Sequence, residues 1–573
     1  MPAVRRARDA VSGDQAGLTP GDESSGSGNK TRLGHRLRSM SPAGLAILTA
    51  TALALALRLF LVTRPGFLTS GNVEYDDGVY LGAALRLLHG ALPYKDYAFV
   101  QPPGIVVVAL PGAIIGTLTS QATGLAAARV LSVLASTACV PLAGRLVRHR
   151  GVLACAVTAG LLAVYPADVL SGRTLLLEPW MNLACLLAAN AAFRQGRLAR
   201  PRWLAWAGVA FGCGVAIKLW AAVPAAVLLA MCLISRPPAE TSRMRRAGAL
   251  IGGAVGGFAV LAGPFVLADP AGFIRETLFY QVSRQGSPPP TSLRLAHLTG
   301  LIDLLGRDGK LASTGTITHS LFALGAEAST RAVAVGWPAY AAAAAGILLI
   351  AAGYLRGVRQ RTPLEWFALV TAVLATAAIM EYSAFFYHYP DFPAPWLAIA
   401  VGVAVQSLAC LIKGADARAR TARRVLAAVV AVVILAIAGL EARELEPANV
   451  QASPASVSAL VPAGSCLVAD QVSFAIAADR FAAPSPGCPD LIDSLAVTLA
   501  LSGGKSPLGG AGDDPKAVAG WEAIFGQAKY VWLSGNASTR IPMTELQSWF
   551  SARFRLIAAY PHYGASKLYV RDH

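Results

Sequence analysis

Long apolar runs separated by short polar segments make up most of this chain. After a polar stretch at residues 1–40, runs of about 18–22 residues that are almost free of charge recur as far as residue 440, and helices of that length cross the hydrocarbon core of a bilayer. A membrane β-barrel would instead show alternating segments of about ten residues, and none dominate here. The pattern predicts an α-helical polytopic membrane protein.

Eleven of the apolar segments are predicted to cross the membrane. Arginine-rich stretches such as "RLVRHRG", "SRPPAETSRMRR" and "KGADARARTARR" recur between them. Because cytoplasmic loops carry an excess of Lys and Arg, these stretches place the N-terminus in the cytoplasm and the C-terminus outside. The predicted spans are 42–63, 125–144, 151–168, 179–193, 203–217, 219–234, 247–267, 334–354, 363–382, 393–412 and 424–440.

One apolar segment does not fit this scheme as a span. The segment 103–119 is short and contains Pro111. If it crossed the membrane, the basic stretch "RLVRHR" after the next span would lie outside, against the positive-inside rule. We therefore expect 103–119 to be re-entrant or interfacial, within a first outer loop at 64–124.

The two ends of the chain differ from the middle. Residues 1–40 are rich in Gly, Ser and Arg without apolar periodicity, which predicts a disordered cytoplasmic tail before a membrane domain at 41–440. In 441–573, "SCLVADQV", "KYVWLSG" and "SKLYVRD" have the pattern of strands, and "MTELQSWFSARF" has that of a helix. This predicts a small extracytoplasmic α/β or α+β domain. It contains Cys466 and Cys488, which pair if the domain faces an oxidising compartment; the sequence leaves that open.

The net charge of the chain is compatible with a membrane protein. The chain of 573 residues carries a formal net charge of +17 with 14% charged residues. In a soluble protein such a charge would suggest nucleic acid, but here the arginines lie mainly in loops where they set topology, so we expect no nucleic-acid partner. Arginine far outnumbers lysine and alanine is abundant, which is typical of a GC-rich bacterial genome and suggests a cell-envelope acceptor. The expected location is the bacterial plasma membrane.

The first outer loop holds the sharpest chemical signal. Asp76 and Asp77 open "DDGVYLGAALRLLHG", whose apolar residues form one broad face, as in a helix lying in the membrane interface. Carboxylates held at headgroup height suit a general base or a metal ligand that acts on a lipid-linked head group. Glu74 is interpreted as part of a solvated loop. Gln101 precedes Pro102 and Pro103. Either this segment only ends the loop and starts the next apolar helix, or the Gln101 side chain is directed at the same site.

Further polar residues lie at the outer ends of the predicted spans. Arg173 and Glu178 in "SGRTLLLEPW" either mark the membrane boundary or supply a phosphate-binding fork and a second carboxylate. Lys218 interrupts a long apolar run, so it either snorkels at a tight turn or binds a lipid phosphate. His388 and Asp391 lie together in an aromatic outer loop and could contact a phosphate or a sugar.

Several catalytic motifs are missing from the sequence. It contains no HExxH, Walker loop, nucleophile elbow, haem motif or paired CxxC. Proteolysis by zinc and transport driven by cytosolic ATP therefore lose support.

Taken together, these residues resemble the GT-C superfamily of glycosyltransferases that use polyprenyl-phosphate-linked sugars, in particular bacterial protein mannosyltransferase-like and aminoarabinose-transferase-like enzymes. The likeness rests on Asp76-Asp77 and Tyr80, on "LPYKDY" with Pro102-Pro103, on "LLLEPWMNLACLLAA" and on "FYHYPDFPAPWLAIAVG", in order within 42–440. It implies a GT-C-like membrane domain and inverting transfer of a hexose or pentose to a cell-envelope glycan, lipid or protein on the extracytoplasmic face. No cofactor is certain; some members need a divalent metal such as Mg or Mn and others do not.

The resemblance also implies roles for single residues. Asp76 matches the leading acidic position and is expected to be the base; Asp77 replaces the usual Glu, and Glu178 matches the second acidic position. Asp76 and Glu178 are also the expected ligands if a metal is used. Gln101 stands where relatives often have Lys or His. The residues expected to bind the lipid phosphate of the donor are Lys218, Arg173, Arg284, His388 and Tyr389.

Two other classes stay open at this point. A transporter or flippase of lipid-linked sugars predicts ionisable groups buried in the middle of spans and helices broken near the membrane centre, whereas most charges here lie at outer ends. A structural or sensory protein whose outer domain binds a wall component would need far fewer spans as its anchor.

Overall fold

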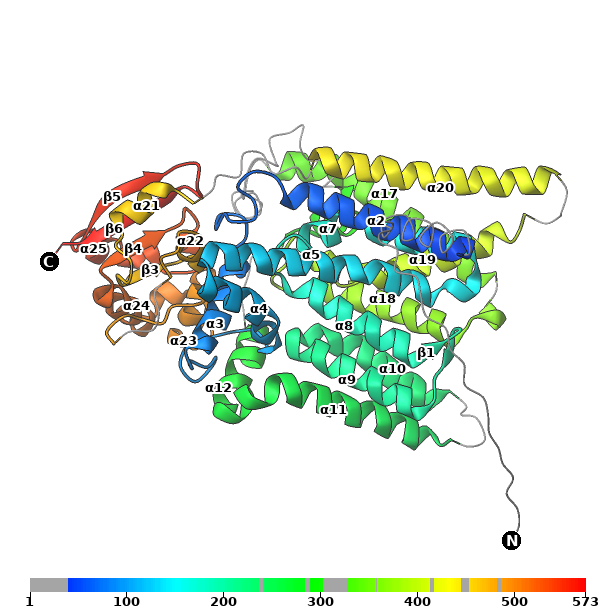
Figure 1. Ribbon diagram of the computed structural model, residues 1–573, viewed down its shortest axis with the longest axis horizontal. Helices are drawn as coiled ribbons and strands as arrows, with labels where there is room; N and C mark the ends of the chain where they lie inside the picture. Colours follow the sequence, from blue (N-terminus) through cyan, green and yellow to red (C-terminus); the bar gives the residue numbers. More distant parts are fainter. Residues whose placement is uncertain are drawn as a thin grey trace, which may run out of the picture.

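The computed structural model describes residues 40–235, 241–283, 289–301, 328–356, 358–412, 417–444, 453–481 and 486–572. It consists of a bundle of long helices with a small mixed domain of sheet and helices at one end (Figure 1). The expected tail at 1–40, apart from its last residue, and Arg284 lie outside the described residues.

The helices of the bundle follow the predicted spans. Among the described residues, six are long and apolar enough to cross a membrane. They are α2 (Pro42–Val62), α5 (Gln121–Leu146), α11 (Arg243–Ala268), α17 (Ala328–Leu355), α18 (Pro363–Glu381) and α20 (Ala417–Glu444). The other predicted spans are shorter helices of the same bundle, namely α6 (Val152–Ala163), α8 (Leu177–Ala192), α9 (Pro201–Ile217), α10 (Ala222–Ile234) and α19 (Ala394–Ala409).

One predicted span is divided. Instead of a single helix over 151–168, α6 ends at Ala163 and a short α7 (Pro166–Ser171) begins after a break. Pro166 explains the break, because proline has no amide hydrogen for a helix interior and fits the first turn of a new helix.

The segment predicted to be interfacial does not traverse the bundle. It forms α4 (Gly104–Leu118), whose first residue packs against the Ala216 carbonyl at the C-terminal end of α9. Its last residue leads within two residues into α5, which starts at that same end of the bundle and reaches the opposite end, where Arg148 donates to Ser41 before α2 (2.8 Å). Both ends of α4 therefore lie on one side, as predicted.

Before α4 lies α3 (Tyr75–Leu88), which begins with the acidic motif. The helix was expected to lie on the membrane with one face exposed to lipid, but every residue from Asp77 to Arg86 is buried. The reason is that α4 and α5 pack on one side of α3 while α22 (Val472–Ala477) of the C-terminal domain packs on another. Other short elements of the bundle include β1 (Phe193–Arg194), β2 (Arg197–Leu198), α12 (Pro270–Ile274), α13 (Tyr280–Ser283) and α14 (Thr291–Leu298).

The C-terminal domain is built on a four-stranded mixed sheet in the order β3-β4-β6-β5. Strand β3 (Leu467–Ala469) is parallel to β4 (Tyr530–Leu533), and the other pairings, with β6 (Ser566–Arg571) and β5 (Phe554–Tyr560), are antiparallel. The three predicted strands are confirmed, and β5 was missed. The helices of the domain are α21 (Ala455–Leu460), α22, α23 (Ser494–Leu501), α24 (Pro515–Gln527) and α25 (Met543–Ser551).

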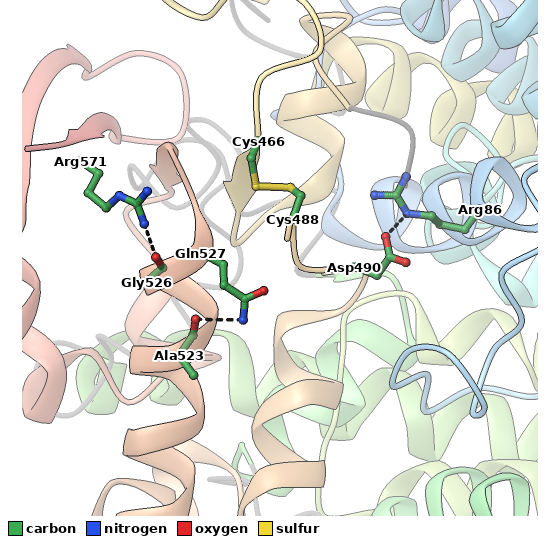
Figure 2. The surroundings of a disulfide bond; sticks show 8 residues. All are labelled: Arg86, Cys466, Cys488, Asp490, Ala523, Gly526, Gln527 and Arg571. Atoms are coloured by element: carbon green, nitrogen blue, oxygen red, sulfur yellow. Dashed lines mark hydrogen bonds and ion pairs between the residues drawn. A yellow bond between two sulfur atoms is a disulfide. The ribbon is translucent and has the colours of Figure 1, made fainter. Parts of the chain in front are cut away.

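A disulfide joins Cys466 to Cys488, the pairing that the sequence left open (Figure 2). It closes a segment that includes α22. Just after the second cysteine, Asp490 forms an ion pair with Arg86 of α3 at 2.7 Å (Figure 2). The disulfide and this ion pair therefore lie beside the contact between the C-terminal domain and α3.

Glycines let the domain approach the first outer loop closely. A Cβ atom on Gly78 would lie 2.1 Å from the amide nitrogen of Ser473, and one on Gly71 would lie 2.2 Å from the Ser473 carbonyl oxygen. The backbone of Gly71 is also hydrogen-bonded in both directions, because its amide donates to Tyr563 (2.8 Å) and its carbonyl accepts from Gln471 (2.9 Å). Membrane bundle and C-terminal domain thus share one tightly packed contact.

Candidate active site

Glu74 starts the acidic motif and caps α3. Its side chain accepts hydrogen bonds from the backbone amides of Tyr75 (2.9 Å) and Asp76 (3.5 Å), as N-cap residues do. Tyr387 donates its hydroxyl to the other carboxylate oxygen at 2.5 Å. Burial raises the pKa of Glu74. The interpretation of Glu74 as solvated loop was therefore wrong, since this residue joins α3 to an outer loop about 300 residues further along.

Asp76 is the carboxyl group best suited to exchange protons. It accepts a 3.2 Å hydrogen bond from Tyr80, one turn further along α3. Burial raises the pKa of Asp76 to about 7, the negative charge of Glu74 adds to the rise, and His388 opposes it. A base with a pKa close to neutrality can take a proton and release it again at physiological pH.

Asp77 points away from Asp76, into the bundle. It is fully buried and forms an ion pair with Arg129 of α5, whose Nε and Nη2 both donate to the same oxygen. The backbone amide of Leu175 donates to its other oxygen at 2.5 Å. With both oxygens bound by the protein, Asp77 holds α3 to α5 and to the loop before α8.

A second charged cluster forms where α8, α9 and the aromatic outer loop meet. Glu178, in the first turn of α8, is fully buried, and its Oε1 contacts both Lys218 and His388, the latter at 2.9 Å from Nδ1. The Lys218 ammonium also lies 3.9 Å from the ring centre of Trp220 and 4.5 Å from that of Tyr389. Such rings favour a cation electrostatically. The second Glu178 oxygen has no hydrogen-bond partner among the described residues.

The two clusters lie near each other. Tyr387, which binds Glu74 at the start of α3, directly precedes His388, which binds Glu178. The charges of His388 and Glu178 also act on the pKa of Asp76. The structure therefore brings together Asp76, Glu178, Lys218, His388 and Tyr389 from separate outer segments.

Other predicted residues have different places. Asp391, expected to act beside His388, is fully buried and accepts from Ser171 (2.5 Å) and Asn182 (3.1 Å), so it fixes the loop that carries His388. The Arg173 guanidinium lies 5.4 Å from the ring centre of Phe67.

The first outer loop also places Gln101. Its backbone carbonyl accepts a hydrogen bond from the Tyr94 hydroxyl at 2.5 Å. This contact stabilises the fold of the loop.

A divalent metal fits this arrangement poorly at Glu178. Its Oε1 is already bound by the Lys218 ammonium and the His388 imidazole, and the ammonium charge would repel a metal ion. In the part of the chain that the structure describes, no group of three or more His, Cys, Asp or Glu residues could hold a metal ion.

Sequence reasoning did not identify three contacts of this site. Tyr80 was named in the family resemblance but not as a partner of Asp76, although it lies four residues later and the helical repeat could have shown the contact. Tyr387 and Arg129 lie in distant segments and carry no local signal for their contacts with Glu74 and Asp77.

Comparison with known proteins supports the same kind of fold. Residues 114–246 match the family described as dolichyl-phosphate-mannose-protein mannosyltransferase. No curated protein matches the chain.

Solved structures cover most of the chain. ArnT from Cupriavidus metallidurans in the apo state is 14% identical, with a TM-score of 0.53 over 92% of this chain and 98% of that one. The same protein bound to undecaprenyl phosphate gives 0.52 over 91% and 97%, also at 14% identity. The archaeal oligosaccharyltransferase AglB from Archaeoglobus fulgidus, in complex with an inhibitory peptide and a dolichol-phosphate, gives 0.49 over 92% and 74% at 14% identity. The fold expected from the GT-C resemblance is confirmed.

Proposed function

We propose that this protein is a membrane glycosyltransferase that moves a sugar from a polyprenyl-phosphate donor to a cell-envelope acceptor. The observation that carries the proposal is that Asp76, whose pKa burial raises to about 7, lies near the Lys218 ammonium and the His388 imidazole, which both bind Glu178. A transfer of this kind needs a base at the acceptor and positive charge at the departing phosphate.

The reaction then proceeds as one displacement. Asp76 takes the proton of an acceptor hydroxyl, and the acceptor oxygen forms a bond to the anomeric carbon. The bond between that carbon and the phosphate oxygen breaks, so the lipid phosphate leaves with the electron pair. Attack from the side opposite the phosphate inverts the configuration at the anomeric carbon.

Lys218 and His388 stabilise the leaving phosphate. Glu178 holds both of them from its Oε1, which fixes their positions before substrate binds. An ammonium and an imidazole already held in place stabilise developing negative charge without reorganising during the reaction. The unpartnered second oxygen of Glu178 is suited to accept a hydrogen bond from a sugar hydroxyl. Arg173, Tyr389 and Arg284 remain proposed contacts to the lipid phosphate.

The comparisons support the choice of donor. The ArnT structure was solved with undecaprenyl phosphate, and the matched family is named for transfer from a dolichyl phosphate. A lipid phosphate carrier is therefore the proposed donor here, and the acceptor is a glycan, lipid or protein of the envelope. Nothing in the comparisons supports the alternative of a transporter or flippase.

We further propose that the site faces the outside of a bacterial plasma membrane. The arginine-rich loops put the opposite end of the bundle in the cytoplasm. The Cys466–Cys488 disulfide supports the same orientation, since disulfides persist outside the reducing cytosol.

The metal requirement can be tested directly. Because Oε1 of Glu178 is already bound by Lys218 and His388, we propose that transfer needs no metal held by Asp76 and Glu178. Transfer should proceed at an unchanged rate in EDTA. A loss of activity that Mg²⁺ or Mn²⁺ restores would refute this part of the proposal.

The proposed activity is tested in the native host and in reconstituted membranes. Deleting the gene should lead to accumulation of one polyprenyl-phosphate-linked sugar and to loss of one sugar from the envelope glycans. Purified protein in proteoliposomes should then move radiolabelled sugar from polyprenyl phosphates carrying hexoses or pentoses to an envelope extract of the deletion strain. Unchanged envelope glycans, together with no transfer from any of these donors, would refute the function.

A further inference from the structure

We propose that the C-terminal domain is a working part of the active site, in which Asp493 positions the Asp76 carboxyl by binding the phenol of Tyr75. The inference rests on the proposed function, because it takes Asp76 as the base. Asp493 and Tyr75 are separated by 418 residues in sequence and meet where the C-terminal domain contacts α3.

The phenol of Tyr75 lies in a polar socket of the C-terminal domain. Its hydroxyl donates to Oδ1 of Asp493 at 2.8 Å and accepts from the backbone amide of Ser494 at 3.1 Å. The guanidinium of Arg540 lies over the Tyr75 ring, 4.1 Å from its centre. The tyrosine is therefore held at its hydroxyl and on one ring face by three residues of one domain.

The socket itself is rigidly supported. Asp470, at the end of β3, is 1% exposed and accepts from Arg540 Nη1 (2.6 Å) and from the amide of Ser534 (2.6 Å). The hydroxyl of Ser494 donates to the Asp470 carbonyl at 2.9 Å. Asp493 caps α23 and is 5% exposed. Buried polar groups that are all paired hold one arrangement, which suits a fixed binding pocket for a side chain.

The socket acts on Asp76 through the first turn of α3. Tyr75 is the first residue of that helix and directly precedes Asp76, and Glu74 before it is held by Tyr387 from the other side. Asp76 accepts its hydrogen bond from Tyr80 of the same helix, so the direction of the carboxyl follows the backbone of this turn. Losing one of the two anchors would let the turn shift, and a shift of about 1 Å at a reacting group can lower a rate by about 10²-fold.

Asp493 also acts on Asp76 through its charge. The ionisable groups that face Asp76 are Glu74 and Tyr80 from α3 and its cap, His388 from the aromatic outer loop, Glu178 from α8 and Asp493 from the C-terminal domain. The negative charge of Asp493 opposes ionisation of Asp76. Position and charge are therefore two separable contributions of the same domain.

Two conservative variants separate the contribution of position from that of charge. Tyr75→Phe keeps the ring over Arg540 but removes the hydroxyl, so kcat for transfer should fall by about 10- to 100-fold. The KM for the donor and the binding of undecaprenyl phosphate should stay within twofold, because Lys218 and His388 are unchanged. Asp493→Asn keeps an oxygen that accepts from Tyr75 but loses the charge, so kcat at high pH should stay near that of the wild type. The acid limb of its pH–rate profile should move to lower pH.

The control is a substitution on the exposed face of the same domain. Arg555→Gln breaks an ion pair with Asp572 on the exposed face of the same domain and should change neither readout. If wild-type protein transfers sugar and a Tyr75→Phe variant that melts like the wild type also matches it in kcat, the inference is refuted. If the wild type transfers nothing, the proposed function fails instead. Should Tyr75→Phe melt at a lower temperature than the wild type, the profile of Asp493→Asn decides alone, and an unmoved acid limb refutes the inference.

Discussion

Replacing Asp76 by Asn removes the proposed base while keeping its shape. The substitution preserves the oxygen that accepts from Tyr80, so α3 should keep its contacts. General bases contribute about 10²–10⁴-fold to rates, so transfer should fall by about that factor. In the wild type the rate should rise with pH through about 7, where Asp76 ionises, and the residual rate of the variant should lack this dependence.

The same substitution should stabilise the fold in a pH-dependent way. Burial raises the pKa of Asp76 to about 7, so the folded protein resists ionisation that the unfolded chain undergoes near pH 4. The cost of the buried charge is absent below about pH 4, grows between about pH 4 and 7, and is complete above. Since one pKa unit corresponds to about 1.4 kcal/mol, the full cost is on the order of 4 kcal/mol. The Asn variant carries no such cost, so its melting temperature should exceed that of the wild type by a margin that is larger at pH 8 than at pH 5.

Transfer in proteoliposomes and melting followed by tryptophan fluorescence in detergent measure the two effects. Asp96→Asn is the matched control, because Asp96 is an exposed residue of the same outer loop that accepts from the Leu92 amide. It should leave both measurements unchanged. Wild-type transfer by Asp76→Asn would refute the assignment of the base. A melting margin that is equal at pH 5 and pH 8 would refute the description of Asp76 as a buried charge.

Further substitutions test the remaining contacts. Lys218→Met should lower kcat/KM for the donor by about 10²-fold and weaken undecaprenyl phosphate binding, measured by native mass spectrometry; unchanged binding would contradict its role. Arg129→Met leaves Asp77 buried without its ion-pair partner and should destabilise the fold by about 3–5 kcal/mol, measured by thermal melting; adding Asp77→Asn should restore much of this loss, and no recovery would contradict the pairing. Cys466→Ser opens a disulfide of sequence separation 22 and should destabilise the C-terminal domain by about 3 kcal/mol, measured as faster cleavage by a protease; an unchanged cleavage rate would be inconsistent with this role.

The membrane helices could be predicted because their signal is local. Apolar runs report burial in lipid or in a bundle without reference to any partner, and the arginine-rich loops then decided the place of α4. Strand β5 was missed for the opposite reason: its residues are mostly half-buried or exposed, so this edge strand lacks the alternation that marks a strand with one buried face. The apolar face of α3 was recognised, but the sequence could not say that a distant domain covers it.

The candidate site was only partly accessible from the sequence. Asp76, Glu178 and Lys218 stood out because a charge beside an apolar run is costly and needs a reason. The residues that contact them could not be identified from the sequence in the same way. The contact between Glu74 and Tyr387 joins residues 313 positions apart, and no property of either segment alone specifies it. The sequence therefore indicated which residue types carry the chemistry, whereas the fold decides which of them are free to act.

The contact between Tyr75 and Asp493 has a consequence for how the protein is made. A ribosome adds about 5–20 residues per second, so the 418 residues between the two take roughly 20–80 s to synthesise. In the proposed orientation the acidic helix is outside the membrane throughout that time, yet its partner domain does not exist. The carboxyl proposed as the base is thus fixed in place only after the last membrane helix has been inserted and the C-terminal domain has folded. On the proposed function, a half-made chain in the membrane is in this way kept from acting on the lipid-linked sugars around it.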